Sequence, residues 1–164
     1  MKIDLVAVGK TVDKNFIASI KEYVNRLSHY AQFSFIEIPE LKNTKNLSEE
    51  QQKQKEEELI MQVVSANDEL ILLDEHGTEF TSVGFSEYLQ KKMNAGGKRL
   101  VFLIGGPYGF SQSVYERANG KISLSQMTFS HQMVRLFLIE QIYRAMTILR
   151  GEPYHHEETL FYDK

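Results

Sequence analysis

Two polar loops in the second half of the chain carry the residue types best suited to hold a ligand. Residues 105–109 (GGPYG) follow the apolar run LVFLI, and residues 124–129 (LSQMTF) follow a short β-forming segment. Each loop leads into a segment whose apolar residues recur at helical spacing. In an open α/β sheet such loops lie at the carboxyl ends of the strands, where ligands bind. The two loops are therefore the first candidates for a binding site.

The glycine-rich loop narrows the kinds of ligand that could bind. Gly105, Gly106 and Gly109 let a ligand approach the backbone closely, because glycine has no Cβ. The loop contains neither the G-x-G-x-x-G dinucleotide fingerprint nor the GK[ST] of a phosphate loop. Recognition of NAD, FAD or ATP through phosphates is therefore disfavoured. A tight structural turn explains the glycines as well as a binding loop does.

The second loop places polar side chains and free backbone groups between a strand and the start of a helix. Such a segment can hydrogen-bond the edge of an adenine through its main chain. Leu124, Met127 and Phe129 would then pack against the ring. An ordinary strand-to-helix connection is the alternative interpretation of the same residues.

Charged residues recur at helical spacing after this loop. His131 and Arg135 are four residues apart, and so are Glu140 and Arg144, on nearly the opposite face of the same helix. A Glu followed by Arg at this spacing is typical of a surface ion pair. The rest of the helix is apolar almost all round, which predicts that one face packs on the sheet and the other on a partner subunit.

The tail after this helix contains Tyr154, His155 and His156, directly after Pro153. A proline-stiffened Tyr-His-His segment beyond a helix end is unusual. It is either an arm that reaches a substrate or an accidental tail.

These loops need a scaffold of strands and helices to position them. Runs of β-forming residues alternate with segments of helical spacing, which predicts one α/β domain with a mostly parallel sheet and helices on both faces. Residues 74–77 (DEHG) are predicted to form the loop after the third strand. The predicted strands are residues 2–9, 33–38, 69–73, 100–104 and 121–125, and helices are predicted to begin near Asp13, Ser48, Ser82, Ser111 and His131.

Composition excludes several classes of site and location. The 164-residue chain has no Cys, which excludes disulfides, thiolate metal sites and cysteine nucleophiles. The five His residues show no HExxH-type spacing, so no metal is expected. No apolar run reaches the roughly 18 residues of a membrane span. The N-terminal segment is too short and wrongly flanked for a signal peptide, so we expect a cytoplasmic protein without membrane contact.

The motifs together resemble those of the bacterial ribosomal large-subunit RNA methyltransferase H family, the pseudouridine N3-methyltransferases of the SPOUT class. The resemblance covers residues 1–157 as a single domain. The sequence departs from the family pattern at His156, where the family has Arg or Lys. It also departs at residues 158–164, which form a C-terminal extension. The matching segments are AVGK (7–10), IGGPYG (104–109), LSQMTFSHQMVRLFLIEQIYRA (124–145) and RGEPYHH (150–156).

This resemblance implies a C-terminal trefoil knot whose loops bind S-adenosyl-L-methionine. It also implies a homodimer whose site is completed across the interface. The reaction would be methylation of N3 of a pseudouridine in the helix 69 loop of 23S rRNA, on assembled ribosomes. The tail of the family matches Tyr154 and His155. Carried over position by position, the cofactor contacts fall on Leu73, Gly105, Leu124, Ser125, Gln126, Met127, Thr128 and Phe129.

The pseudouridine nitrogen must lose its imide proton before it accepts a methyl group. In the mechanism that we expect, Tyr154 and His155 cover or orient the base from the partner subunit. Arg144 or Arg135 stabilises the developing anion or a nearby phosphate. His155 is the first candidate for a general base, because the ordinary pKa of His is about 6.5, and Glu140 is the alternative.

Two other classes of function stay open, and the net charge of the chain limits how it could contact RNA. The alternatives are a non-catalytic ribosome-associated assembly module and a small-molecule methyltransferase. The net charge of −3 argues against a strongly basic nucleic-acid binder. Contact with RNA would therefore use local basic patches, doubled in a dimer. The residues expected to form them are Lys91, Lys92, Lys98, Arg99, Arg117 and Lys121.

Overall fold

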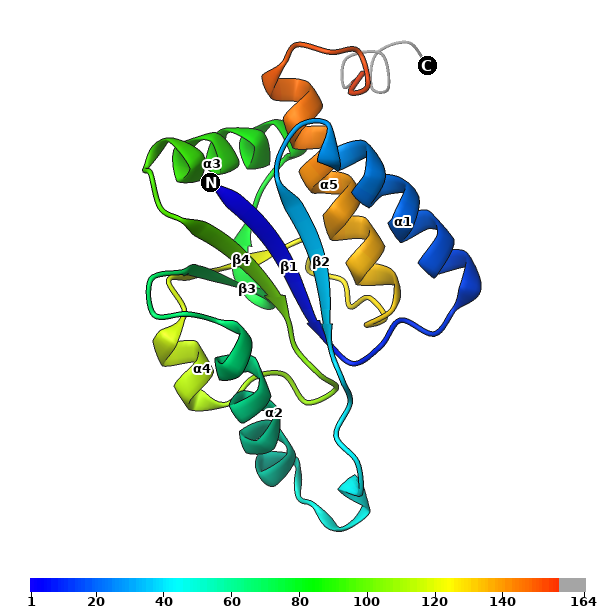
Figure 1. Ribbon diagram of the computed structural model, residues 1–164, viewed down its shortest axis with the longest axis vertical. Coiled ribbons are helices and arrows are strands. Elements are labelled where there is room, and N and C mark those ends of the chain that lie inside the picture. The colour runs from blue at the N-terminus through cyan, green and yellow to red at the C-terminus, as the bar shows by residue number, and fades with distance from the viewer. Residues whose placement is uncertain (157–164) are drawn as a thin grey trace.

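The computed structural model describes residues 1–156, so the predicted extension 158–164 lies outside the described residues. Strands and helices alternate along the chain (Figure 1). The strands are β1 (Lys2–Val8), β2 (Phe33–Ile38), β3 (Glu69–Glu79), β4 (Arg99–Ile104) and β5 (Gly120–Ser123). The helices are α1 (Lys14–Ser28), α2 (Glu49–Val63), α3 (Ser82–Asn94), α4 (Gln112–Arg117) and α5 (Met133–Leu149), with a short 3-10 helix η1 (Thr44–Asn46).

The strands form one parallel sheet in the order β2-β1-β4-β3-β5. Both faces of this sheet are covered, which explains why β4 is a continuous apolar run. Leu100, Phe102 and Ile104 join the core on one face, whereas Val101 and Leu103 join the core on the other. The predicted fold class, an α/β fold with a mostly parallel sheet, is confirmed.

Helices cover both faces, as the sequence predicts. Helices α1, α3 and α5 contribute to one core, and α2 and α4 contribute to the other (Figure 1). Side chains of Asp13, Ser48, Thr81 and Ser111 cap the first four helices by accepting backbone N–H groups. Helix α5 begins two residues after the predicted His131, because residues 130–132 form a preceding turn.

The predicted loop at residues 74–77 is instead part of β3, and this prediction was wrong. Strand β3 continues to Glu79, but its pairing with β5 shifts register, so that Leu73 and Thr78 both face Ile122. The residues between them bulge out of the ladder. A Cβ on Gly77 would lie 2.5 Å from the backbone of Ile122, so only glycine fits there. Asp and Gly are uncommon in strands, which is why the sequence pattern indicated a loop.

Arg135 joins helix α5 to the carboxyl end of β1. Its side chain is only 1% exposed. The guanidinium donates to the carbonyl oxygens of Val8 (3.0 Å) and Gly9 (2.8 Å) and to Thr11 Oγ1 (2.9 Å). It also lies 3.3 Å from a carboxylate oxygen of Glu37. Burial lowers the pKa of Arg135, an effect that the nearby carboxylate of Glu37 opposes.

Glu56 of α2 supports the glycine loop that follows β4. Its side chain is 5% exposed, and its carboxylate oxygens lie 2.7 Å from where a Cβ on Gly106 would be. Gln52 donates to it at 3.4 Å. Burial raises the pKa of Glu56, and the Gln52 contact opposes this effect. The loop is therefore held against an acid that is stabilised in its protonated form.

Replacing Arg135 tests its role in the fold. Arg135→Met removes the guanidinium that donates to the carbonyls of Val8 and Gly9 and pairs with Glu37, so we expect the free energy of unfolding in urea to fall by about 3 kcal/mol. Lys53→Met removes a cation from a surface pair with Glu50 (3.2 Å) and should change the free energy of unfolding by at most about 0.5 kcal/mol. Equal effects of the two substitutions would contradict the role assigned to Arg135.

The raised pKa of Glu56 predicts a pH-dependent contribution to stability. Between its unfolded-state and folded-state pKa values, the native protein binds more protons at this position than the unfolded chain, so rising pH weakens the fold. Glu56→Gln removes this effect. The stability gained by the variant should therefore grow as pH rises from about 4.5 towards neutral, as measured by urea unfolding at several pH values. Glu58→Gln, on the exposed side of the same helix, is the matched control. A gain that does not change with pH would refute the assignment.

Candidate functional site

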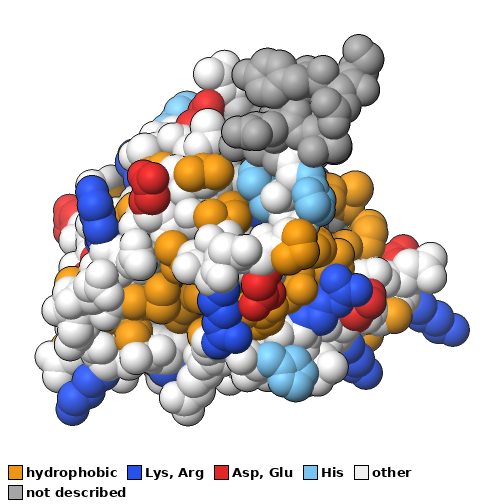
Figure 2. Space-filling view, turned by 90° about the horizontal axis from the view of Figure 1, so that it is seen from above, with side chains coloured by type: hydrophobic (Ala, Val, Ile, Leu, Met, Phe, Trp, Pro, Cys, Tyr) orange, Lys and Arg blue, Asp and Glu red, His pale blue; other side chains and the backbone are white. Residues whose placement is uncertain are grey.

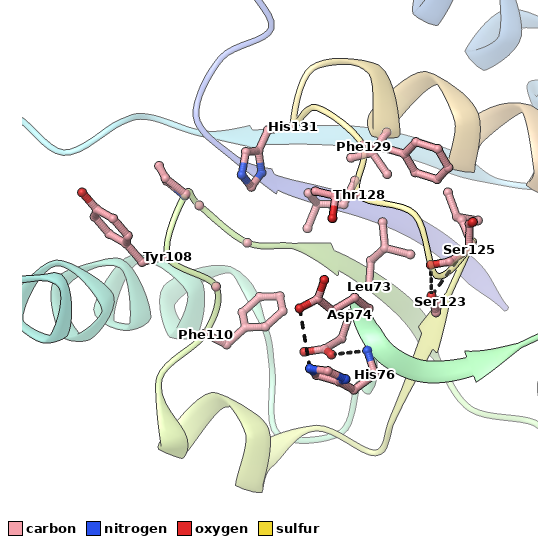
Figure 3. Close-up of a pocket in the computed structure, with 18 of the residues that line it drawn as sticks. Leu73, Asp74, His76, Tyr108, Phe110, Ser123, Ser125, Thr128, Phe129 and His131 are labelled. Atoms are coloured by element: carbon pink, nitrogen blue, oxygen red, sulfur yellow. Dashed lines mark hydrogen bonds and ion pairs between the residues drawn. The ribbon is translucent and has the colours of Figure 1, made fainter.

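A cavity of about 490 Å³ opens beside the bulge of β3 and at the carboxyl ends of β4 and β5. In Figure 3, Asp74 and His76 lie on one side of it, and Thr128, Phe129 and His131 lie on the other. All but one of the predicted cofactor-binding residues line this cavity. The exception, Gln126, is exposed and is not among the lining residues. The residues brought together are Leu73, Gly105, Leu124, Ser125, Met127, Thr128 and Phe129.

The glycine loop is both a tight turn and a wall of the cavity. Gly109 donates its N–H to the carbonyl of Gly106 (3.1 Å) and has a φ of +79°, which favours glycine. A Cβ on Gly105 would lie 2.8 Å from the ring of Phe110. The interpretation as a tight turn is confirmed, and the turn brings the backbone of the loop to the edge of the cavity. That the loop binds a ligand stays a prediction.

Serine hydroxyls fix the shape of the second loop. Ser123 Oγ donates to the carbonyl of Ser125 (2.8 Å), and Ser125 Oγ accepts from the N–H of Met127 (3.0 Å). Phe129 packs edge-on against Phe137 of α5, with 5.4 Å between the ring centres. Met127 is 74% exposed at the rim. The loop therefore presents an apolar side chain and ordered backbone groups to the cavity.

The charges that line this cavity are acidic or His, from Asp74, Glu75, His76 and His131. No Lys or Arg of the described residues lines it. Asp74 accepts a hydrogen bond from the hydroxyl of Tyr115, a residue of α4. This contact was missed from the sequence, because nothing in the pattern relates two residues 41 positions apart.

The predicted catalytic residues of α5 and the tail form a second cluster. Arg144 donates to Glu140 Oε1 through Nη2 (2.7 Å) and Nε (3.0 Å), and Tyr154 donates to the same oxygen (2.9 Å). Arg144 Nη1 donates to His155 Nδ1 at 3.0 Å. Burial raises the pKa of Tyr154, and its hydrogen bonds to Tyr23 and Glu140 raise it further. The tail is therefore attached to the fold by a partly buried polar network.

This cluster borders a second cavity of about 530 Å³, lined by residues of α1, α3 and α5 that include Glu140 and Arg144. The two cavities share Ser123, Leu124 and Phe129 as a common wall. The predicted cofactor residues and the predicted catalytic cluster thus lie on the two sides of one loop. Arg135 lines neither cavity, and its guanidinium is bonded within the protein.

Three of the six basic residues expected to contact RNA are bound by acceptors of the protein itself. Arg99 lies 3.1 Å from Asp4 and 2.9 Å from Asp68, at the amino end of β4. Lys92 and Arg117 are likewise bound by acceptors of the chain. Figure 2, which views the molecule from above, shows Lys and Arg side chains scattered among acidic and apolar ones. The structure therefore shows no continuous basic block on this face.

Other possible kinds of site receive no support from the described chain. Within residues 1–156, no group of three or more His, Asp or Glu side chains could hold a metal ion. Over the same residues, no helix is long and apolar enough to cross a membrane.

Comparison with known proteins identifies the family to which the chain belongs. A family described as "Predicted SPOUT methyltransferase" matches residues 1–155. The chain is 64% identical to a ribosomal RNA large subunit methyltransferase H of Flavobacterium johnsoniae, over 96% of this chain and 100% of that protein. It is 62% identical to the protein of the same name from Parabacteroides distasonis, with the same coverage. A third, from Christiangramia forsetii, is 63% identical over 95% of this chain and 99% of its own length. The chain therefore belongs to the SPOUT methyltransferase family.

Proposed function

We propose that this protein transfers a methyl group from S-adenosyl-L-methionine to N3 of a pseudouridine in the helix 69 loop of 23S rRNA. The observation that carries the proposal is the cavity between the bulge of β3 and the carboxyl ends of β4 and β5, which gathers all but one of the cofactor residues that the resemblance implies. The names of the relatives favour ribosomal RNA as the substrate. A protein that modifies assembled ribosomes works in the cytoplasm.

The cavity suits this cofactor in size and chemistry. Its volume, about 490 Å³, is within the ~300–1,000 Å³ of small-molecule sites. Its walls combine apolar side chains, such as Leu124 and Phe129, with backbone groups of two ordered loops. S-adenosylmethionine has no phosphate and supplies, when bound, a methyl group on a positively charged sulfur. A cavity lined by acidic residues and without Lys or Arg from the described residues matches that charge. We infer that the bulge of β3 and the loops after β4 and β5 belong to the trefoil knot of the family.

The separation of the cofactor cavity from the tail cluster favours a homodimer. Within one chain, residues 123–129 separate the cofactor cavity from Tyr154 and His155. A second copy would bring its own tail to the cavity. Apolar side chains of α3 and α5 line the second cavity, which supports such a contact. Figure 2 also shows hydrophobic side chains exposed between charged ones at the end of the molecule where α5 ends.

The tail cluster can prepare the base for methylation. Glu140 already accepts hydrogen bonds from Arg144, Tyr154 and Gln141, which leaves His155 as the better proton acceptor. His155 Nδ1 accepts from Arg144, so uptake of a proton at that atom breaks the contact. Nη1 of Arg144 can then donate to the imide anion, while Nε and Nη2 stay bound to Glu140. Tyr154 keeps its hydroxyl proton, because its pKa is raised, and so remains a donor.

Methyl transfer to ribosomes tests the proposal directly. Labelled S-adenosylmethionine is supplied with ribosomes that lack this modification, and ribosomes that lack the pseudouridine serve as a parallel substrate. We expect label in 23S rRNA that depends on the pseudouridine. Cofactor binding with no transfer to either substrate would favour a non-catalytic assembly module. Transfer to a small molecule only would favour the third class of function.

The role of His155 is tested by single-turnover methylation. His155→Ala should slow the chemical step about 100-fold, because the base that removes the imide proton is lost. His156→Ala changes the adjacent, exposed histidine and should leave the step near the wild-type rate. A chemical step in His155→Ala as fast as that of the wild type would remove His155 from the mechanism.

A further inference from the structure

The cofactor cavity contains one acidic side chain whose position is fixed by the fold. Asp74 is half-buried and lies in the bulge where β3 leaves its ladder with β5. It accepts a hydrogen bond from the N–H of His76 (2.8 Å) and another from the hydroxyl of Tyr115. Figure 3 shows its side chain between Leu73 and His76, beside the cavity. Glu75, the other acid of the lining, is 61% exposed by its side chain and lies 3.6 Å from the imidazole of His76.

The donors to Asp74 are themselves held in place. The ring of Tyr115 packs edge-on against Phe110, with 5.7 Å between the ring centres. Burial and the acceptor Asp74 raise the pKa of Tyr115 to about 12, so its hydroxyl remains a donor at neutral pH. The backbone N–H of His76 is fixed by the bulge, which Gly77 closes against Ile122. The carboxylate of Asp74 is thus preorganised before any ligand enters.

We propose that Asp74 lets the cavity distinguish the positively charged methyl donor from its neutral product, S-adenosylhomocysteine. This inference rests on the proposed function. In the reaction the sulfur–methyl bond breaks and the N3–methyl bond forms. The sulfur keeps the bonding electron pair and becomes neutral, while the imide proton goes to the base. A fixed carboxylate in a half-buried cavity attracts the cation and loses that attraction when the charge disappears. Its effect is therefore to hold the donor and release the product.

Recognition of charge can be told apart from two other roles of Asp74, because only this role favours the charged donor over the neutral product. A carboxylate that accepted a hydrogen bond from the cofactor's ribose would favour donor and product equally, because both carry that sugar. A carboxylate that only stabilised the bulge would also affect both ligands equally. A change in the ratio of the two affinities therefore isolates the recognition of charge.

The test is isothermal titration calorimetry of the wild-type protein and variants with three ligands. These are S-adenosylmethionine, S-adenosylhomocysteine and sinefungin, which carries a charged amine in place of the sulfonium. Asp74→Asn should weaken binding of the two cationic ligands about tenfold and change binding of S-adenosylhomocysteine less than about twofold. Glu79→Gln makes the same charge change further along β3, outside the cavity lining, and should leave all three affinities near the wild-type values.

A second variant keeps the carboxylate and removes one of its donors. Tyr115→Phe should leave the ratio of the donor and product affinities within about twofold of the wild-type ratio, even if both affinities fall. The inference would be overturned if Asp74→Asn weakened the binding of all three ligands equally. It would also be overturned if Tyr115→Phe lowered the ratio of the donor and product affinities as much as Asp74→Asn does. A wild-type protein that binds none of the ligands would refute the proposed function as well. Pseudouridine-dependent methylation with an unchanged ratio in Asp74→Asn would refute only the role of Asp74.

Discussion

The structure depends on the buried guanidinium of Arg135. Three segments meet at this group: the carboxyl end of β1, the loop that follows it, and the first turn of α5. Gln132 reinforces the junction, because its side chain donates to the carbonyl of Lys10 and accepts from the N–H of Val12. The start of α5 is thereby fixed relative to the sheet. The loop of residues 124–129 leads to that start and forms the wall between the two cavities.

A parallel sheet brings the segments that line the first cavity together without any need for contacts among them. Strands β3, β4 and β5 all point the same way, so the bulge of β3 and the segments that follow β4 and β5 lie on one side of the sheet. Glycine is needed in this region for two different reasons. Gly109 supplies a positive φ, whereas Gly77 supplies a close approach to the backbone of β5. The cavity therefore depends on the backbone at least as much as on side chains.

Much of this arrangement was predictable from sequence, because its signals are local. Alternating strand and helix patterns gave the fold class, and the capping residues Asp13 and Ser48 marked helix starts. Leu73 and Gly105 could be placed together because the sequence predicts that a strand ends at each of them, although β3 continues beyond Leu73 to Glu79. Contacts between residues distant in sequence could not be predicted. The contact between Asp74 and Tyr115 depends on how α4 packs, and the burial of Arg135 depends on the position of the loop after β1.

The bulge in β3 has a consequence for how the sequence can vary. Leu73 and Thr78 face the same residue of β5, so the intervening residues take no part in the ladder. Substitutions at Asp74, Glu75 or His76 therefore leave the hydrogen bonds of the sheet intact, while Gly77 is fixed by its approach to β5. The bulge thus separates positions that line the cavity from the glycine that allows the close approach of two strands. A substitution that changes the charge of the cavity can therefore occur in this bulge without the loss of a hydrogen bond between strands.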